Sequence, residues 1–261
     1  DLTVATFFGG DPSKEKYVAR FVRTAVGYAY YRGGLSLSLG VASGIVGPMT
    51  GIATWEDFAR LYSQTPTRRV LPNIPKEEVK MIEDFLGYAF VRKVVLEEAM
   101  THGSMSAAIE SDAKRRTDSK VKSSYERLEF LGDSVLDFIA VLYWLERDML
   151  VTEGTLRERI KESANNKALG ALCIELGLYK PVRHTKLYKS ILSGKQAVEG
   201  AAKTPKYWNR LEIPKQGFAD VIESTFGAVF VDSRFNLQDT QRLFDRIIRP
   251  FYTIHFPMAS V

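Results

Sequence analysis

Cysteine and histidine are scarce in this sequence of 261 residues, which contains one cysteine and three histidines. The single cysteine, Cys173, excludes an internal disulfide and a metal site built from several thiolates, and it favours a reducing compartment. His184 and His255 lack the spacing of paired metal ligands. The patterns GxSxG, GxxxxGK(S/T) and GxGxxG are absent. The sequence therefore offers no support for a serine hydrolase triad, a nucleotide-triphosphate loop or a dinucleotide fold.

Long apolar runs are missing as well. The longest uncharged stretch, residues 33–55, is interrupted by glycine and proline and contains several serines and threonines. A membrane-spanning helix needs about 20 mostly apolar residues, so we expect no membrane segment. Targeting signals are absent too, and with the single cysteine this leads us to expect an intracellular protein, in the cytoplasm or the nucleus. Few stretches alternate with the period of two residues that is typical of strands. The sequence therefore predicts an all-α protein.

Charge of one sign is only slightly in excess, since 36 Lys and Arg face 31 Asp and Glu. A net charge of +5 is weak support for an anionic partner. The excess is concentrated in residues 179–215, which hold nine basic and two acidic side chains. This segment is interpreted either as a solvated lysine-rich loop or as a surface for a polyanion, and its composition does not separate the two.

Apolar periodicity and breakers divide the chain into three parts. Residues 1–39 contain a helical segment, over about 17–39, which ends near two consecutive glycines. Residues 40–75, rich in Gly, Pro, Ser and Thr, are predicted to be a linker. Residues 76–255 are predicted to form a helical domain that includes an exposed loop at 102–123. The expected helices of this domain are 76–86, 92–100, 123–147, 153–162, 165–177, 217–231 and 237–250.

The helix expected at 123–147 carries a row of acids opposite its apolar stripe. Glu126, Glu129 and Asp133 are spaced i, i+3, i+7, so they fall within roughly a 60° arc, and Asp137 extends the row. Ser123 and Glu126 also form a capping-box pattern, which predicts that the helix begins at this serine. Solvated acids are the ordinary explanation of one such row.

A second apolar helix repeats the arrangement, with Asp220 and Glu223 at i, i+3. Each helix also contains an interior glycine, Gly132 or Gly227, which costs about 1 kcal/mol relative to alanine. Both glycines are explained if the two helices approach closely and need bare backbone at the contact. The two acidic rows would then converge.

Converging carboxylates in a partly buried site repel one another unless a cation binds between them. Oxygen ligands without nearby His or Cys favour Mg²⁺ or Mn²⁺ over zinc. Two such ions can activate water and stabilise the leaving oxygen of a phosphodiester. With a basic surface nearby to hold a polyanion, the chemistry suggests a metal-dependent phosphodiesterase acting on nucleic acid, without distinguishing DNA from RNA.

The acidic motifs resemble those of the ribonuclease III family. The first is the run of eleven residues from Glu126 to Leu136, ERLEFLGDSVL, and the second is ADVIESTFGA at residues 219–228. Supporting matches are LEEAMTHGS at 96–104 and NNKALGAL at 165–172, in the family order. The resemblance covers about residues 76–252 and implies the helical ribonuclease III fold.

The resemblance also implies roles. Glu129, Asp133, Asp220 and Glu223 would coordinate Mg²⁺ or Mn²⁺. Glu126 would support the site or a second metal position, and Lys215 would contact the scissile strand. The family cleaves double-stranded RNA and leaves 5′-phosphate and 3′-hydroxyl ends with two-nucleotide 3′ overhangs. His102 also matches a family position, where a structural hydrogen-bonding role is expected.

Members of the family work as pairs of ribonuclease III domains, from two chains or within one chain. The signature helix lies at that interface, so Phe130 would pack against the partner, with an ordinary core position as the alternative. Three features resemble the second ribonuclease III domain of Dicer proteins. They are residues 228–233, the Arg249-Pro250 pair and the long loop before the signature. The predicted partners are therefore double-stranded RNA and a second ribonuclease III domain, in a homodimer or an intramolecular pair.

The N-terminal part resembles the tail of a preceding ribonuclease III domain. Residues 19–27 match 219–227 in pattern, and Arg20 and Arg23 stand where the second copy has Asp220 and Glu223. If the alignment holds, the first copy cannot bind metal there. Two functions follow as hypotheses. The first is an active endoribonuclease for small-RNA production, and the second is a catalytically silent module that binds double-stranded RNA or serves in assembly.

Overall fold

The computed structural model describes residues 12–50, 54, 57, 60, 73–105, 124–214 and 217–257, and of residues 12–21, 35 and 46–50 only the helical backbone. The chain divides into two compact units, Asp1–Thr67 and Arg68–Val261. Within the described residues there is no strand, only one isolated bridge between Thr101 and Arg183. The predicted all-α class is therefore confirmed.

The first unit contains one long helix, α2 (Pro12–Thr50), which is broken at a glycine pair. Gly33 and Gly34 leave helical geometry, with Gly34 at a φ of 65°, and the break lies where the sequence predicted the helix to end. The helix then resumes and continues through residues 40–50, which were predicted to belong to the linker. Glycine, proline and serine in this stretch weaken a helix without preventing one, so composition alone gave the wrong boundary.

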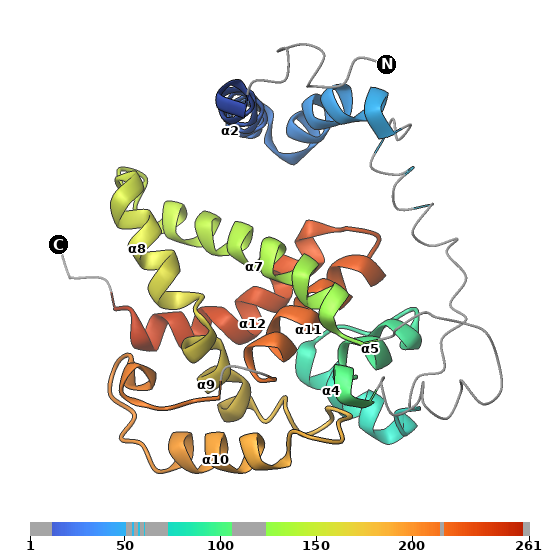
Figure 1. Ribbon diagram of the computed structural model, residues 1–261, viewed down its shortest axis with the longest axis vertical. Helices are drawn as coiled ribbons and strands as arrows, with labels where there is room; N and C mark the ends of the chain where they lie inside the picture. Colours follow the sequence, from blue (N-terminus) through green and yellow to red (C-terminus); the bar gives the residue numbers. More distant parts are fainter. Residues whose placement is uncertain are drawn as a thin grey trace. The chain divides into compact units, whose positions relative to one another are not determined.

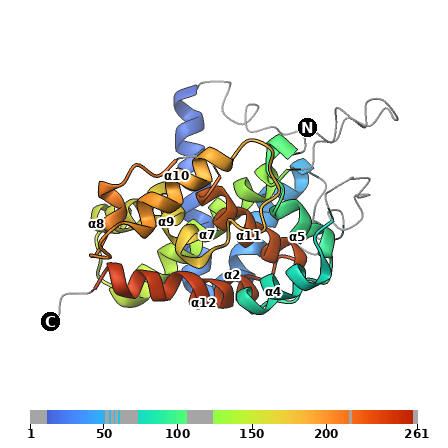
Figure 2. The ribbon, with the colours of Figure 1, turned by 90° about the horizontal axis from the view of Figure 1, so that it is seen from below.

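The second unit is built around α11 (Ala219–Asp232), at the centre of Figures 1 and 2. It packs against α5 (Lys93–Ala99), α7 (Glu126–Arg147), α9 (Asn166–Leu176) and α12 (Leu237–His255), and most extensively against α7. Every residue of α11 except Asp220 is buried. A helix that is apolar on all sides is stable only when other elements surround it, which explains its central position.

The remaining helices of this unit follow the predicted pattern closely. Helix α4 (Lys76–Leu86) ends at Gly87, which adopts the left-handed conformation (φ 67°) expected of a C-terminal glycine. The N-terminus of α8 (Glu153–Ser163) is capped by the side chain of Thr152, and that of α9 by Asn165. Cys173 on α9 is fully buried, as a small apolar side chain would be.

In the second unit, two predicted helix ends differ from the structure by more than two residues. Helix α7 begins at Glu126 with Tyr125 at the N-cap and no side-chain cap, so Glu126 does not occupy the third position that the capping box requires. Ser123 lies outside the described residues. Helix α12 continues past Pro250 to His255. Buried contacts of Phe251 and His255 with Trp208 outweigh the backbone hydrogen bond that this proline cannot donate.

The basic segment contains a helix that the sequence did not predict, α10 (Tyr188–Glu199), followed by a 3₁₀ turn (Tyr207–Arg210). Gly194 weakened the apolar pattern, yet this glycine is where α10 contacts the core. A Cβ on Gly194 would lie 2.6 Å from the Phe218 ring. Close packing of α10 against Phe218 therefore requires glycine. The same glycine interrupts the apolar pattern, which is why periodicity did not predict the helix.

Candidate metal centre

The site lies where α7 and α11 cross with almost no space between their backbones. A Cβ built on Gly132 of α7 would lie 1.7 Å from the carbonyl oxygen of Glu223, and one on Gly227 of α11 would lie 2.1 Å from that of Leu128. No side chain fits at either position. The predicted role of both glycines is therefore confirmed, since each makes room for the opposite helix.

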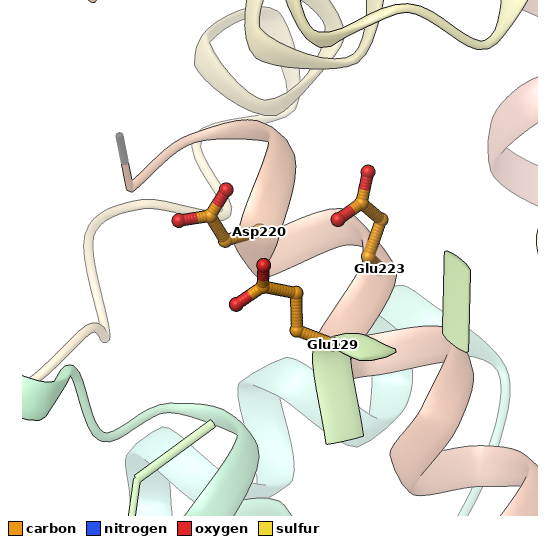
Figure 3. Close-up of side chains that lie close together, drawn as sticks. All are labelled: Glu129, Asp220 and Glu223. Carbon is orange, nitrogen blue, oxygen red and sulfur yellow. The ribbon is translucent and has the colours of Figure 1, made fainter. Parts of the chain in front are cut away.

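This crossing brings together three of the four carboxylates that were predicted to bind metal. One oxygen from each of Glu129, Asp220 and Glu223 lies within 4.8 Å of the others. Figure 3 shows Glu129 approaching from α7 and the two other side chains from α11, with their carboxylates gathered in one space. Glu223 is 8% exposed, while Glu129 and Asp220 are half-buried.

The electrostatic state of the cluster follows from burial and like charge. Burial, together with the charges of Asp220, Glu126 and Asp133, raises the pKa of Glu129 from 4.5 to about 7. Burial, together with several neighbouring carboxylates, Asp133 first among them, raises the pKa of Glu223 to about 8. Both shifts mean that the charged forms are unfavourable here, as expected of carboxylates that converge without a counter-charge.

No Lys or Arg among the described residues forms an ion pair with these carboxylates. The donor set consists of carboxylate oxygens only, on a side that is half open to solvent. Such a set fits a hard divalent cation such as Mg²⁺ or Mn²⁺, which keeps part of its water shell. A bound cation would relieve the repulsion that raises both pKa values.

The other predicted site residues are distributed around this cluster. Asp133 is exposed and lies outside the group of three, although its charge reaches both Glu129 and Glu223. Glu126 is also exposed at the start of α7, where a Cβ on Gly103 would lie 2.8 Å from its Oε1. Lys215 lies outside the described residues.

Tyr125 is a site residue that the sequence reasoning missed. Its hydroxyl donates a 3.0 Å hydrogen bond to Oδ2 of Asp220, and the backbone N–H of Gly217 donates another of 3.0 Å to the same oxygen. Gly217 has a φ of 98°, which is unfavourable for other residues. The available signals were a tyrosine directly before the first acidic motif and a glycine two residues before the second acidic helix.

The loop after α5 holds His102 beside Tyr125, with their rings 5.5 Å apart at 74°. The ring nitrogen Nδ1 of His102 accepts a hydrogen bond from the backbone N–H of Ser104. Burial lowers the pKa of His102. These contacts agree with the structural hydrogen-bonding role that was expected for this histidine.

Residues 183–189 of the basic segment contact the loops that hold the acidic cluster. The backbone N–H of His102 bonds to the carbonyl of Arg183, and Leu187, at the start of α10, lies against Gly217. Lys186 and Lys189 are exposed there and form no ion pair with any described residue. Other basic side chains farther along do pair, as Lys203 does with Glu175 and Lys206 with Glu162.

Phe130 lies on the outer face of α7 and is 80% exposed. The alternative of an ordinary core position is therefore wrong for this residue. Packing of Phe130 against a partner domain stays a prediction.

Comparisons with known proteins agree with this geometry. The family model described as Ribonuclease III domain matches residues 126–234. Protein Dicer from Schizosaccharomyces pombe is 27% identical over 232 residues, which covers 87% of this chain and 16% of that protein. Dicer-like protein 1 from Neosartorya fischeri is 28% identical over 250 residues, which covers 91% of this chain and 16% of that protein. The chain thus spans about a sixth of the length of these curated relatives.

The second unit makes up about three quarters of the chain, so these alignments extend into the first unit. The nuclease domain of ribonuclease III from Campylobacter jejuni shares the fold, with a TM-score of 0.50 at 22% identity over 70% of this chain and 99% of that one. In the part of the chain that the structure describes, no helix is both long enough and apolar enough to span a bilayer. Residues 126–234 therefore make up a ribonuclease III domain, within a chain that is similar over most of its length to Dicer and Dicer-like proteins.

Proposed function

We propose that this chain is the cleaving part of a Dicer-like enzyme that hydrolyses double-stranded RNA with Mg²⁺ or Mn²⁺. Its products would carry 5′-phosphate and 3′-hydroxyl ends with two-nucleotide 3′ overhangs and would serve as small RNAs. The observation that carries the proposal is the convergence of oxygens from Glu129, Asp220 and Glu223 within 4.8 Å, from two helices. The family match at residues 126–234 supports the reaction class.

The chain's own residues would do three things in this reaction. Glu129, Asp220 and Glu223 would hold the divalent cation, and Asp133 would add charge or a ligand through water from its exposed position. When bound, the cation supplies Lewis acidity that activates water and stabilises charge on the phosphate oxygens. Glu126, beside the cluster, would support the site from the start of α7.

The start of the basic segment supports a duplex RNA substrate. Lys186 and Lys189 lie exposed around Leu187, which contacts the loop that leads into Asp220. The ammonium groups of these two lysines would hold backbone phosphates of a duplex whose scissile bond lies at the carboxylates. Recognition would use duplex shape and 2′-hydroxyls, because the deep groove of A-form RNA hides the base edges. Lys215 is proposed to contact the scissile strand.

A second ribonuclease III domain is the proposed protein partner. Exposure of Phe130 on α7 supports an interface at this face. We further propose that the first unit is the tail of a degenerate ribonuclease III domain, with Arg20 and Arg23 in place of metal-binding acids. Arg23 is exposed on α2, where it could not form a buried metal site. An intracellular location, in the cytoplasm or the nucleus, is part of the same proposal.

The proposal is tested by incubating an end-labelled RNA duplex with the chain and MgCl₂, beside an EDTA control and a DNA duplex of the same sequence. We expect staggered cutting of RNA only, and only with the divalent cation. Glu223→Gln should abolish cleavage while duplex binding persists. Glu158→Gln, at an exposed position of α8, is the matched control and should cut normally.

Two outcomes would contradict the proposal. Cleavage by Glu223→Gln at the normal rate would remove the metal assignment. Duplex binding without cutting by the unmodified chain, with a second ribonuclease III domain supplied as partner, would favour the catalytically silent module instead.

A further inference from the structure

Tyr125 ties together three segments that meet at the acidic cluster. Its backbone N–H donates to the carbonyl of Thr101 at 2.8 Å, and its ring packs edge-on against His102 in the loop after α5. Its hydroxyl reaches Asp220 at the start of α11, a residue 95 positions away in the sequence. The side chain is almost fully buried, with 2% exposed. Backbone, ring and hydroxyl are thus each fixed by a different partner.

The two oxygens of Asp220 are used differently. Oδ2 accepts two hydrogen bonds, from the Tyr125 hydroxyl and from the backbone N–H of Gly217. Oδ1 accepts none from any described residue. A carboxylate oxygen with two donors has its lone pairs occupied, whereas the other oxygen keeps its own available to a cation. The hydrogen bonds from Tyr125 and Gly217 therefore leave Oδ1 as the oxygen of Asp220 that is available to a cation.

We propose that Tyr125 is a positioning residue that holds the Asp220 carboxylate in the orientation in which Oδ1 binds the divalent cation. This inference rests on the proposed function, because it assumes that the cluster binds Mg²⁺ or Mn²⁺. Tyr125 acts through Asp220 and does not itself contact the cation.

The hydrogen bond from Tyr125 is needed because the neighbouring carboxylates repel Asp220. Glu129 and Glu223 each place an oxygen within 4.8 Å of an oxygen of Asp220, so rotation of Asp220 toward solvent would lower the repulsion in the cation-free chain. Asp220 is half-buried, which leaves it a path to the solvent. The Tyr125 hydrogen bond opposes this rotation, so the cation finds its ligand already oriented. Outer hydrogen-bond partners of metal ligands contribute to metal affinity in this way.

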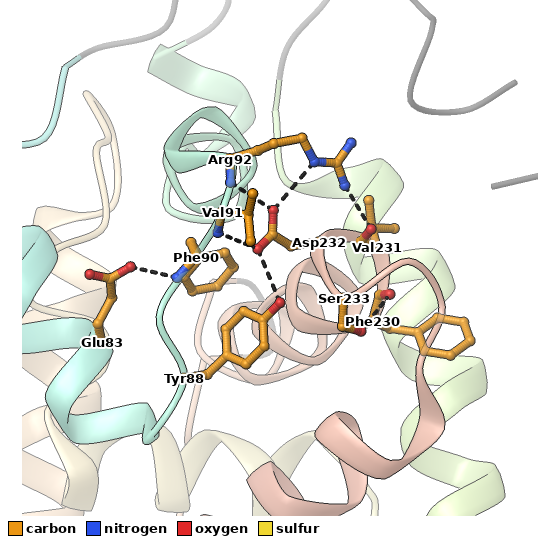
Figure 4. Close-up of polar contacts among 9 residues, drawn as sticks. All are labelled: Glu83, Tyr88, Phe90, Val91, Arg92, Phe230, Val231, Asp232 and Ser233. Carbon is orange, nitrogen blue, oxygen red and sulfur yellow. Dashed lines mark hydrogen bonds and ion pairs between the residues drawn. The ribbon is translucent and has the colours of Figure 1, made fainter. Parts of the chain in front are cut away.

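The opposite end of α11 carries a bond of the same kind that serves as an internal control. Oδ2 of Asp232 accepts from the Tyr88 hydroxyl at 3.0 Å and from the backbone N–H of Val91 at 2.7 Å, as Figure 4 shows. Oδ1 of Asp232 is occupied by Arg92, whose backbone N–H and side chain both donate to it. The two tyrosines thus make the same bond, but only the one at Asp220 lies beside the acidic cluster.

The test compares Tyr125→Phe with Tyr88→Phe by titrating Mn²⁺ into the RNA-free chain in a calorimeter. Each change removes one phenol hydroxyl and keeps the ring. We expect Tyr125→Phe to bind Mn²⁺ about tenfold more weakly than the unmodified chain and Tyr88→Phe to bind it equally well. Equal Mn²⁺ affinity in Tyr125→Phe and the unmodified chain would overturn the inference.

RNA cleavage gives a second readout that a purely structural role would not change. In Tyr125→Phe, the Mn²⁺ concentration for half-maximal cleavage should rise about tenfold, while the rate at saturating Mn²⁺ stays close to normal. A lower maximal rate with unchanged half-saturation would contradict positioning. Glu223→Gln distinguishes a failure of this inference from a failure of the proposed function. If both Glu223→Gln and Tyr125→Phe bind Mn²⁺ normally, the metal assignment itself fails. If Glu223→Gln loses Mn²⁺ binding and Tyr125→Phe keeps it, only the role of Tyr125 is refuted.

A measurement on the unmodified fold covers the case in which Tyr125→Phe does not fold. The chain is labelled with 3-fluorotyrosine at position 125 alone or at position 88 alone, and Mg²⁺ is titrated while the ¹⁹F spectrum is recorded. The signal from position 125 should shift along the calorimetric binding curve, and the signal from position 88 should stay unchanged. A signal from position 125 that ignores saturating Mg²⁺ would contradict the inference.

Discussion

Replacing Glu223 by glutamine is expected to stabilise the cation-free chain at alkaline pH and to leave its stability unchanged at acidic pH. The reason is the pKa of this buried carboxyl, which rises from 4.5 to about 8 through burial and the charges of neighbouring acids. Below about pH 4.5 the group is protonated in both the folded and the unfolded chain. Between about pH 4.5 and pH 8 the unfolded chain loses the proton first, so the folded state is progressively disfavoured.

The size of the effect follows from the same numbers. At about 1.4 kcal/mol per pKa unit, moving a carboxyl from 4.5 to about 8 makes its ionised form about 5 kcal/mol less favourable in the folded chain. We expect about 2 kcal/mol to appear as stability, because Asp133, the largest of the charges involved, is exposed, so that water and salt screen its repulsion. For a domain of this size that difference corresponds to about 4–8 °C in Tm.

The assay is urea denaturation in EDTA at pH 4 and at pH 8.5, followed by circular dichroism, with Glu158→Gln as a surface control. Glu223→Gln should exceed the unmodified chain by about 2 kcal/mol at pH 8.5 and match it at pH 4. Adding Mg²⁺ at pH 8.5 should stabilise the unmodified chain and not the variant, since a ligand stabilises only the state that binds it. Parallel pH curves for the two proteins would refute the reasoning.

Further predictions concern the helix contact and the exposed face of α7. Gly132→Ala should destabilise the second unit by more than about 3 kcal/mol, because the new Cβ would overlap the backbone of α11. Gly154→Ala is the control and should be neutral or slightly stabilising, because no atom lies within 4 Å of the position of its Cβ. The free energies of unfolding of the two variants are compared by urea denaturation. Phe130→Glu should keep the stability of the monomer within about 0.5 kcal/mol and abolish pairing between ribonuclease III domains, as measured by light scattering after size exclusion; a dimer that persists would exclude this face.

The sequence alone determined the class of the fold and predicted which two helices carry the acids. Helical periodicity predicted the helices of the second unit apart from α10, because most of them bury one apolar face and expose the other. The acid spacing on the signature helix and the glycine inside each apolar helix were local features. Together they predicted that two helices cross closely and bring their carboxylates together, and Gly132 and Gly227 meet the opposite backbone as expected.

Where local pattern competed with long-range packing, the prediction failed. Gly194 hid α10, although this glycine is what lets α10 pack on Phe218. Pro250 marked a helix end that the aromatic contacts of Phe251 overrode. Glycine and proline report only a local backbone preference, and burial of large side chains can outweigh it.

Only the tertiary structure decided how the acids are arranged. It brought Glu129 together with Asp220 and Glu223 and left Asp133 exposed outside that group, although all four belong to the same two motifs. It also joined Tyr125 to Asp220 across 95 residues of sequence. Spacing along a helix fixes which side chains share a face. The distance between faces depends on how two helices cross, and that crossing is set by packing across the whole domain.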